Sequence, residues 1–320
     1  LLSRECRLER IGLAPPFVIE RWCYEFKEQS VLAGLIKSMR PRQWPKNGFV
    51  FVALLFDRKL FDPASVLAVF GAFGLLCLMS SAVYLMNDLA DIESDRQHPV
   101  KKHRPLASGK LDPKIAAAAS FLFAAVSLVA GYLLSVELAI ILLLYLVSQI
   151  AYTFKLKHIV LLDVLTIALG FVLRIAAGVA VIEVERFSPW LYVFGGFLAL
   201  FMALGKRRAE ITLLGGDAGN HRAILDDYNL DLIDRLQGIV TTSSIVAYSL
   251  YTFLAEGLPE NHAMMLTIPF VLYGVFRYLY LIHVRNEGGA PEEILLRDRP
   301  LQITLTLYGF MVFVALYLLN

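Results

Sequence analysis

Charged residues are scarce in this sequence, and their scarcity excludes an ordinary water-soluble globular domain. Only 18% of the 320 residues are charged, whereas 58% are hydrophobic and the mean hydropathy is +0.62. A composition of this kind is typical of a protein that crosses a membrane several times. The chain also lacks any Ser-rich, Gly-rich or low-complexity linker. We therefore expect a single membrane domain over residues 31–320.

The sequence also lacks the signatures of several other protein classes. Its three cysteines have neither the spacing of metal ligands nor a paired framework, which predicts free thiols in a reducing setting. The Gly-Gly pairs at 215–216 and 288–289 fit neither a P-loop nor a dinucleotide fingerprint. No Ser/His/Asp or Cys/His nucleophile arrangement is visible. Residues 1–30 lack a secretory signal pattern, and we expect them to be an N-terminal extension with an interfacial helix over 17–26.

Long apolar runs predict the membrane-spanning helices. A run of about 17–25 apolar residues is long enough to cross a hydrocarbon core about 30 Å thick. We expect an all-α, polytopic membrane protein with about nine transmembrane helices around a central cavity that opens to the cytoplasmic side. The first span is short, and Pro41 and Pro45 disturb its start. The expected spans are residues 46–58, 64–88, 112–134, 137–154, 160–182, 188–206, 237–256, 264–284 and 301–319.

The distribution of Lys and Arg predicts the orientation of these spans. With the N-terminus inside, 25 of the 30 Lys and Arg residues fall in cytoplasmic segments, as the positive-inside rule requires. Only Arg58, Lys59 and Arg186 fall outside, and Arg174 and Arg277 fall within spans. We therefore expect a multi-pass protein of the inner cell membrane with its active site facing the cytoplasm.

An acidic run at the end of the second predicted span is the most informative stretch. Asp88, Asp91 and Asp95 have i, i+3, i+7 spacing, which places three carboxylates on one face of a helix, and Asn87 flanks that face. Acidic side chains at the mouth of a membrane helix are costly unless a cation is held there. Oxygen ligands of this kind suit Mg²⁺, which is usually held by one or two carboxylates plus substrate phosphates. We predict that these four residues are catalytic and that the three aspartates bind Mg²⁺.

Basic and polar residues on the predicted cytoplasmic side are candidate phosphate ligands. The planar guanidinium of Arg104, which follows the aspartates, suits a phosphate. The alternative interpretation is anchoring to lipid headgroups or, for the intramembrane Asp163 and Arg174, structural pairing with other helices. Consecutive basic residues at 206–208 spread around a helix, so at most two can face one cavity. The predicted substrate-binding residues are Arg42, Lys46, Lys101, Arg104, Tyr152, Lys157, Asp163, Arg174, Lys206 and Arg207.

Four segments of the sequence together resemble a known family. The run NDLADIESD at 87–95 resembles the first aspartate-rich motif of UbiA-type intramembrane prenyltransferases. Relatives in quinone and haem biosynthesis carry a second acidic motif after the sixth span, whereas this chain has the basic GKRRAE at 205–210. That segment resembles the decaprenyl-phosphate phosphoribosyltransferase branch, as do RPRQWPKN at 40–47, the basic run at 95–105 and LKH at 156–158.

The resemblance covers about residues 31–319 and implies a function. It implies Mg²⁺-dependent transfer of a 5-phosphoribosyl group from phosphoribosyl pyrophosphate to a decaprenyl-type polyprenyl phosphate, with release of pyrophosphate, for lipid-linked sugars of the cell envelope. Its partners would be these two substrates and the membrane, with no nucleic acid. One alternative is a prenyltransferase that moves a polyprenyl group from its diphosphate to an aromatic or other small acceptor. A transporter of anionic solutes is the other, although no convincing internal repeat is visible.

Overall fold

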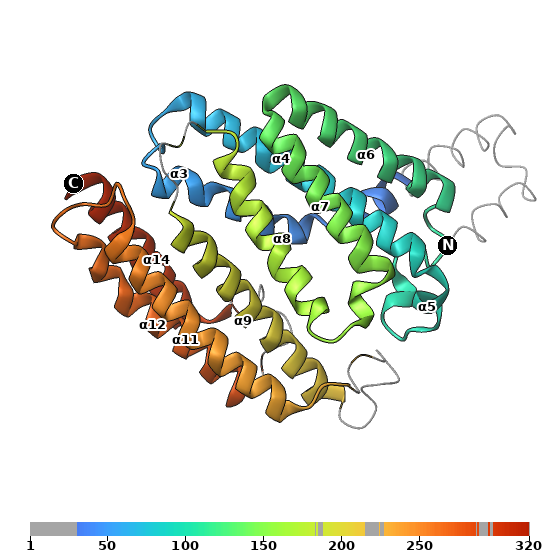
Figure 1. Ribbon diagram of the computed structural model, residues 1–320. Helices are drawn as coiled ribbons and strands as arrows, with labels where there is room; N and C mark the ends of the chain where they lie inside the picture. The colour runs from blue at the N-terminus through green and yellow to red at the C-terminus, as the bar shows by residue number, and fades with distance from the viewer. Residues whose placement is uncertain are drawn as a thin grey trace, which may run out of the picture. The chain divides into compact units, whose positions relative to one another are not determined.

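The computed structural model describes most of the chain beyond residue 30. The predicted N-terminal extension and both Gly-Gly pairs lie outside the described residues. The described part is helical and contains no β-strand (Figure 1), so the predicted all-α fold is confirmed. The described residues are 31–319 without 183, 185–187, 215–223, 225–226, 286, 288–293 and 295–296.

Seven of the described helices are long and apolar enough to cross a membrane. Five of them begin at a proline or have one in the first turn, where the missing N–H would have no intrahelical partner anyway. The short helix η7 (Ala263–Thr267) precedes α12, and the π-helical turn η8 (Val314–Leu318) follows α14. The seven are α4 (Pro63–Ala90), α6 (Pro113–Leu134), α7 (Val136–Phe154), α8 (Leu162–Val179), α9 (Pro189–Leu214), α12 (Ile268–His283) taken together with η7, and α14 (Arg299–Phe313) taken together with η8.

An eighth long helix, α11 (Leu230–Leu254), corresponds to the predicted span 237–256. Its N-cap is Asn229, whose side chain accepts a hydrogen bond from the backbone N–H of Leu232 at 2.7 Å. α11 is not among the seven helices apolar enough to span a membrane, and it contains the polar run Thr-Thr-Ser-Ser at 241–244. Ser244 is buried, and its hydroxyl donates a hydrogen bond to the carbonyl of Val240 at 2.8 Å. This bond offsets the cost of burying a polar group.

The first predicted span has an unusual helical form. Residues Pro41–Phe51 form the 3₁₀ helix η2, with Pro45 inside it, and the short α-helix α3 (Val52–Phe56) follows. A 3₁₀ helix rises about 2.0 Å per residue, so these two elements together cover roughly 30 Å, the thickness of a hydrocarbon core. The predicted effect of the prolines is confirmed. The total of nine spans stays a prediction.

Contacts between residues divide the chain into two compact units. The first unit contains the chain up to Pro45 and Cys77–Ser127, and the second contains Lys46–Leu76 and the chain from Leu128 onward. Both α4 and α6 contribute residues to each unit, so the division does not fall at a linker. The single domain expected for 31–320 remains a prediction.

Within the second unit, α9 packs against α8 on one side and α11 on the other (Figure 1). The element α3 also packs against α8. The segment that precedes α3 lies very close to α8. A Cβ added at Gly178 of α8 would be only 2.0 Å from the carbonyl oxygen of Val50 in that segment. Glycine is therefore required at this position by space, not by backbone conformation.

Candidate functional site

The acidic motif lies at the junction of two helices in the first unit. The helix α4 ends at Ala90, and Asp91 is the N-cap of α5 (Ile92–Gln97). Backbone hydrogen bonds still run from Asp91 to Asn87 at 3.0 Å and from Asp95 to Asp91 at 2.8 Å, so the chain keeps a helical path through the junction. Asp88 and Asp95 are both buried at 2% exposure, whereas Asn87 and Asp91 are half-buried.

Two arginines bind the buried carboxylates. Arg104 donates from Nη1 to Asp88 Oδ1 at 3.1 Å and to Asp95 Oδ2 at 2.7 Å. Arg40 donates from Nη2 to the same Asp88 oxygen, and its guanidinium lies 4.8 Å from the centre of the Tyr84 ring. Pairing of this kind compensates a buried negative charge that would otherwise be costly. Arg104 thus lies beside both aspartates, and its role as a phosphate ligand stays a prediction.

Arg40 was missed as a site residue by the sequence analysis. It belongs to the basic segment 40–47, but nothing in its spacing distinguished it from Arg42, which is exposed. Its position depends on tertiary contacts of its neighbours: Trp44 Nε1 donates to Ser81 Oγ at 3.2 Å, and Ser81 Oγ donates to the Met39 carbonyl at the same distance. These bonds hold the segment against α4. Lys101, in the short helix η3 (Lys101–His103), is exposed.

The three aspartates do not gather into one cluster. Within the described ranges, no group of three or more His, Cys, Asp or Glu side chains lies close enough together to hold a metal ion. Asp88 and Asp95 instead share the guanidinium of Arg104. A Mg²⁺ site needs only one or two protein carboxylates when substrate phosphates supply the other oxygens, so the oxygen-only donors still fit this ion. The ligand roles of Asp88, Asp91 and Asp95 stay predictions.

A second buried network joins α8, α9 and the residues before α11. Asp163 is 0% exposed, and its Oδ2 accepts from Arg207 Nε at 2.7 Å. Its Oδ1 accepts from the hydroxyl of Tyr228 at 2.7 Å, and that hydroxyl also accepts from the backbone N–H of Leu161 at 2.8 Å. Burial raises the pKa of Tyr228 above its ordinary value, and the hydrogen bond to Asp163 raises it further. The tyrosine therefore remains a proton donor.

The three residues of the basic run at 206–208 have different surroundings. Arg207 is 2% exposed and also binds Glu210 on the next turn of α9. Arg208 donates from Nε to Asp234 Oδ1 at 2.8 Å, and Lys206 is exposed. Arg207, predicted to bind substrate, is thus held between two carboxylates in this structure.

Arg174 lies in the interior of the second unit. It is 7% exposed and donates to Asn47 Oδ1 at 2.8 Å, to the Gly170 carbonyl at 2.7 Å and to the Tyr145 hydroxyl at 3.0 Å. All three acceptors are uncharged, and the rings of Tyr145 and Phe171 lie 5.0 and 5.3 Å from the guanidinium carbon. Asp163 and Arg174 both lie on α8, but they belong to separate networks. Lys46, Tyr152 and Lys157 are half-buried.

Comparison with known proteins identifies the class: the fold is that of UbiA-type membrane proteins. A UbiA homolog from Archaeoglobus fulgidus bound to DMAPP and Mg²⁺ matches with a TM-score of 0.68, covering 89% of this chain and 99% of that chain at 17% identity. The model of the UbiA prenyltransferase family matches residues 48–293. The chain belongs to the UbiA prenyltransferase family.

Two curated relatives are more similar in sequence. The decaprenyl-phosphate phosphoribosyltransferase of Mycolicibacterium smegmatis is 34% identical over an alignment of 288 positions, which covers 86% of this chain and 90% of the relative. The enzyme of the same name from Corynebacterium glutamicum is 32% identical over an alignment of 295 positions, which covers 89% of this chain and 87% of the relative. The resemblance found in the sequence is confirmed, and so is the prediction that the protein is an enzyme of the transferase class.

Proposed function

We propose that the protein transfers a 5-phosphoribosyl group from phosphoribosyl pyrophosphate to a polyprenyl phosphate and releases pyrophosphate. The observation that carries this proposal is the pairing of the buried acidic motif with Arg104 and Arg40. Guanidinium groups bind phosphate oxygens in the same planar, two-pronged manner in which they bind carboxylates. A donor with three phosphate groups and a lipid phosphate both require such cations. The names of the curated relatives point to the same reaction.

The residues of this motif divide the chemical work between two kinds of group. One or two of Asp88, Asp91 and Asp95 would hold Mg²⁺ together with the donor's phosphates, and the ion would neutralise charge on the departing pyrophosphate. Arg104 and Arg40 would bind phosphate oxygens and stabilise the negative charge that grows there. The bond between ribose C1 and the pyrophosphate oxygen breaks as an oxygen of the lipid phosphate bonds to C1. That oxygen is already anionic, so the reaction requires no strong general base.

The direct test is transfer of label into lipid. Membranes containing the protein are incubated with Mg²⁺, polyprenyl phosphate and phosphoribosyl pyrophosphate labelled in the ribose. We expect label in the organic extract only when both substrates and Mg²⁺ are present, and none after chelation with EDTA. Label that stays in the aqueous phase under all conditions would contradict the proposal.

A substitution then connects the reaction with the acidic motif. We expect Asp88→Asn to lower the rate of transfer by a factor on the order of 10²–10³, the usual effect of removing one group that stabilises the developing charge. Glu93→Gln is the matched control, because Glu93 lies on the adjoining helix α5 with a side chain 81% exposed. Equal rates in the two variants would show that the acidic motif does not act on the donor.

A second candidate function is prenyl transfer to a small acceptor. It is favoured by the similar fold of the A. fulgidus homolog bound to DMAPP and Mg²⁺. The same assay distinguishes the two, because an isoprenyl diphosphate labelled in its isoprenyl group would then enter a new product, and labelled phosphoribosyl pyrophosphate would not.

A further inference from the structure

A pocket of about 530 Å³ opens in the second unit, where α3 ends, α9 begins and α11 ends. It lies at the opposite end of α9 from Arg207, since 18 helical residues separate Pro189 from Arg207 and span roughly 27 Å. Its apolar side is formed by Phe56, Leu191, Tyr251, Ala255 and Leu258. Phe56 and Tyr251 pack edge to face at 5.6 Å between ring centres within a buried aromatic cluster. The apolar side is therefore rigid and formed in advance, as in ligand sites generally.

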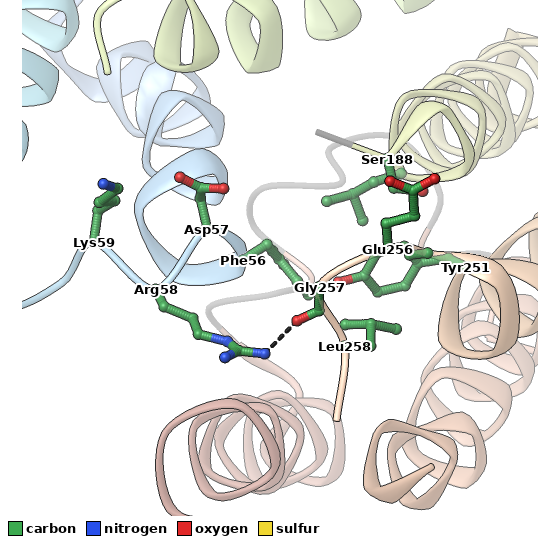
Figure 2. A pocket seen from close by; sticks show the side chains of 11 residues that line it. Phe56, Asp57, Arg58, Lys59, Ser188, Tyr251, Glu256, Gly257 and Leu258 are labelled. Carbon is green, nitrogen blue, oxygen red and sulfur yellow. Dashed lines mark hydrogen bonds between the residues drawn. The ribbon is translucent and has the colours of Figure 1, made fainter. Parts of the chain in front are cut away.

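Arg58 lines this pocket with a backbone conformation that is unfavourable for a residue with a Cβ. The helix α3 closes with a hydrogen bond from the Lys59 N–H back to the Leu54 carbonyl at 3.0 Å, and Arg58 between them has φ = 58°. This position at a helix end usually holds glycine, because a Cβ is unfavourable at positive φ. The Arg58 side chain extends to the backbone carbonyl of Gly257 and donates to it (Figure 2). A guanidinium is thus kept in the pocket where the backbone alone would favour glycine.

A second polar group points to a ligand. Ser188 lines the pocket immediately before α9, and its Oγ is buried without a hydrogen-bond partner among the described residues. A buried hydroxyl that makes no hydrogen bond is destabilising, and native structures rarely leave one in that state. An acceptor atom from a ligand in the pocket would satisfy this donor.

The charges of the lining are balanced. Arg58 and Lys59 contribute two cations, and Asp57 and Glu256 contribute two carboxylates. In Figure 2 the carboxylates of Asp57 and Glu256 point to the top of the view, with Lys59 on the Asp57 side, and the guanidinium of Arg58 lies below them. Arg58 and Lys59 are also two of the three cations that the predicted orientation places outside the membrane. A ligand with separate positive and negative groups, no net charge and an apolar part matches this lining.

We propose that this pocket binds the headgroup of a zwitterionic phospholipid with a primary ammonium, phosphatidylethanolamine. Its phosphodiester would accept hydrogen bonds from Arg58, Lys59 and the Ser188 hydroxyl. Its ammonium would lie toward Asp57 and Glu256, and the glycerol and first methylenes would pack on Phe56 and Leu258. The site is at the end of the spans, where lipid headgroups are found. It is independent of the proposed transfer reaction.

The test measures lipid-dependent thermal stability of the full-length protein, delipidated in a neutral detergent. Dihexanoyl phosphatidylethanolamine is the probe, with dihexanoyl phosphatidylcholine, dihexanoyl phosphatidylglycerol and inorganic phosphate as comparisons. We expect the ethanolamine lipid to raise Tm by about 5 °C at a hundredfold excess over Kd, and the other three to raise it less. A larger shift with phosphatidylglycerol, or an equal one with inorganic phosphate, would overturn the choice of ligand.

Two variants test the residues without disturbing the fold. Arg58→Gly removes the guanidinium and suits the positive φ, and Ser188→Ala removes the unsatisfied hydroxyl, so the lipid-free Tm of both should hold or rise. We expect each to weaken the apparent affinity for the ethanolamine lipid, Arg58→Gly by at least about tenfold. Arg235→Ala is the control, since its side chain is 75% exposed near the far end of α11. Affinity unchanged in both pocket variants, or lowered equally in the control, would refute the site.

Discussion

The three consecutive basic residues at 206–208 have three different environments. Neighbouring residues on a helix point about 100° apart, so the sequence predicted that at most two of them could face one cavity. The structure separates all three: Lys206 is exposed, Arg207 is buried with Asp163, and Arg208 binds Asp234. Which one would be buried could not be predicted, because it depends on Asp163, a residue 44 positions earlier in the chain.

Burial of Arg207 leads to a prediction about stability. Removing one partner of a buried ion pair leaves the other charge uncompensated and costs roughly 3–5 kcal/mol, whereas an exposed pair contributes only about 0–1 kcal/mol. We therefore expect Arg207→Met to lower Tm far more than Arg208→Met, whose partner Asp234 has a side chain 38% exposed. In the double variant Arg207→Met/Asp163→Leu, the loss should be smaller than the sum of the two single losses.

Thermal unfolding of the four variants in detergent checks this prediction. Arg208→Met serves as the internal control, since it removes the same type of side chain from the next position. If Arg207→Met kept the Tm of the unaltered protein and lost only activity, the guanidinium would act on substrate instead of holding α8 and α9 together.

At the scale of elements, the segment 41–56 shows what sequence patterns can and cannot predict. Its two prolines correctly predicted an irregular start to the first span, since proline removes a backbone donor. The 3₁₀ form of η2 was not predicted, nor was its contact with α8 through Asn47 and Arg174. Hydropathy detects the length of an apolar run but not how closely two backbones approach, and that approach depends on Gly178.

The close approach at Gly178 predicts that a change from glycine to alanine lowers Tm at this position but not at a glycine in open space. Gly178→Ala would place a Cβ 2.0 Å from the Val50 carbonyl oxygen, so the two elements must separate. Overpacking of this kind typically costs about 1–3 kcal/mol, and we expect a clear fall in Tm. The same change at Gly238 in α11 meets no atom within 4 Å and should hold or raise Tm, because alanine favours a helix. Equal effects at the two positions would show that η2 does not pack closely on α8.

At the scale of the whole molecule, the sequence was most informative about the class of protein and least informative about which charged and polar side chains bind one another. The long apolar runs predicted the helical membrane fold, and the acidic run at 87–95 with the basic run at 205–210 predicted the family. The partners of these charges come from distant parts of the chain. Arg40 reaches Asp88 across 48 residues, and Tyr228 reaches Asp163 across 65. No spacing rule relates residues so far apart, so the networks could be found only in the structure.

Orientation in the membrane is the whole-molecule property that the charge distribution predicts most directly. Lys102 and Glu260 are both exposed, and the positive-inside rule places the first in the cytoplasm and the second outside. In a variant whose native cysteines are replaced, we expect a membrane-impermeant maleimide to label Glu260→Cys in intact cells and Lys102→Cys only after the membrane is opened. The opposite labelling pattern would show that the protein has the inverted orientation. The pocket at Arg58 would then lie on the cytoplasmic side, and the acidic motif would lie away from a cytoplasmic sugar donor. Labelling therefore decides whether the proposed donor can reach Asp88 from the compartment in which it is made.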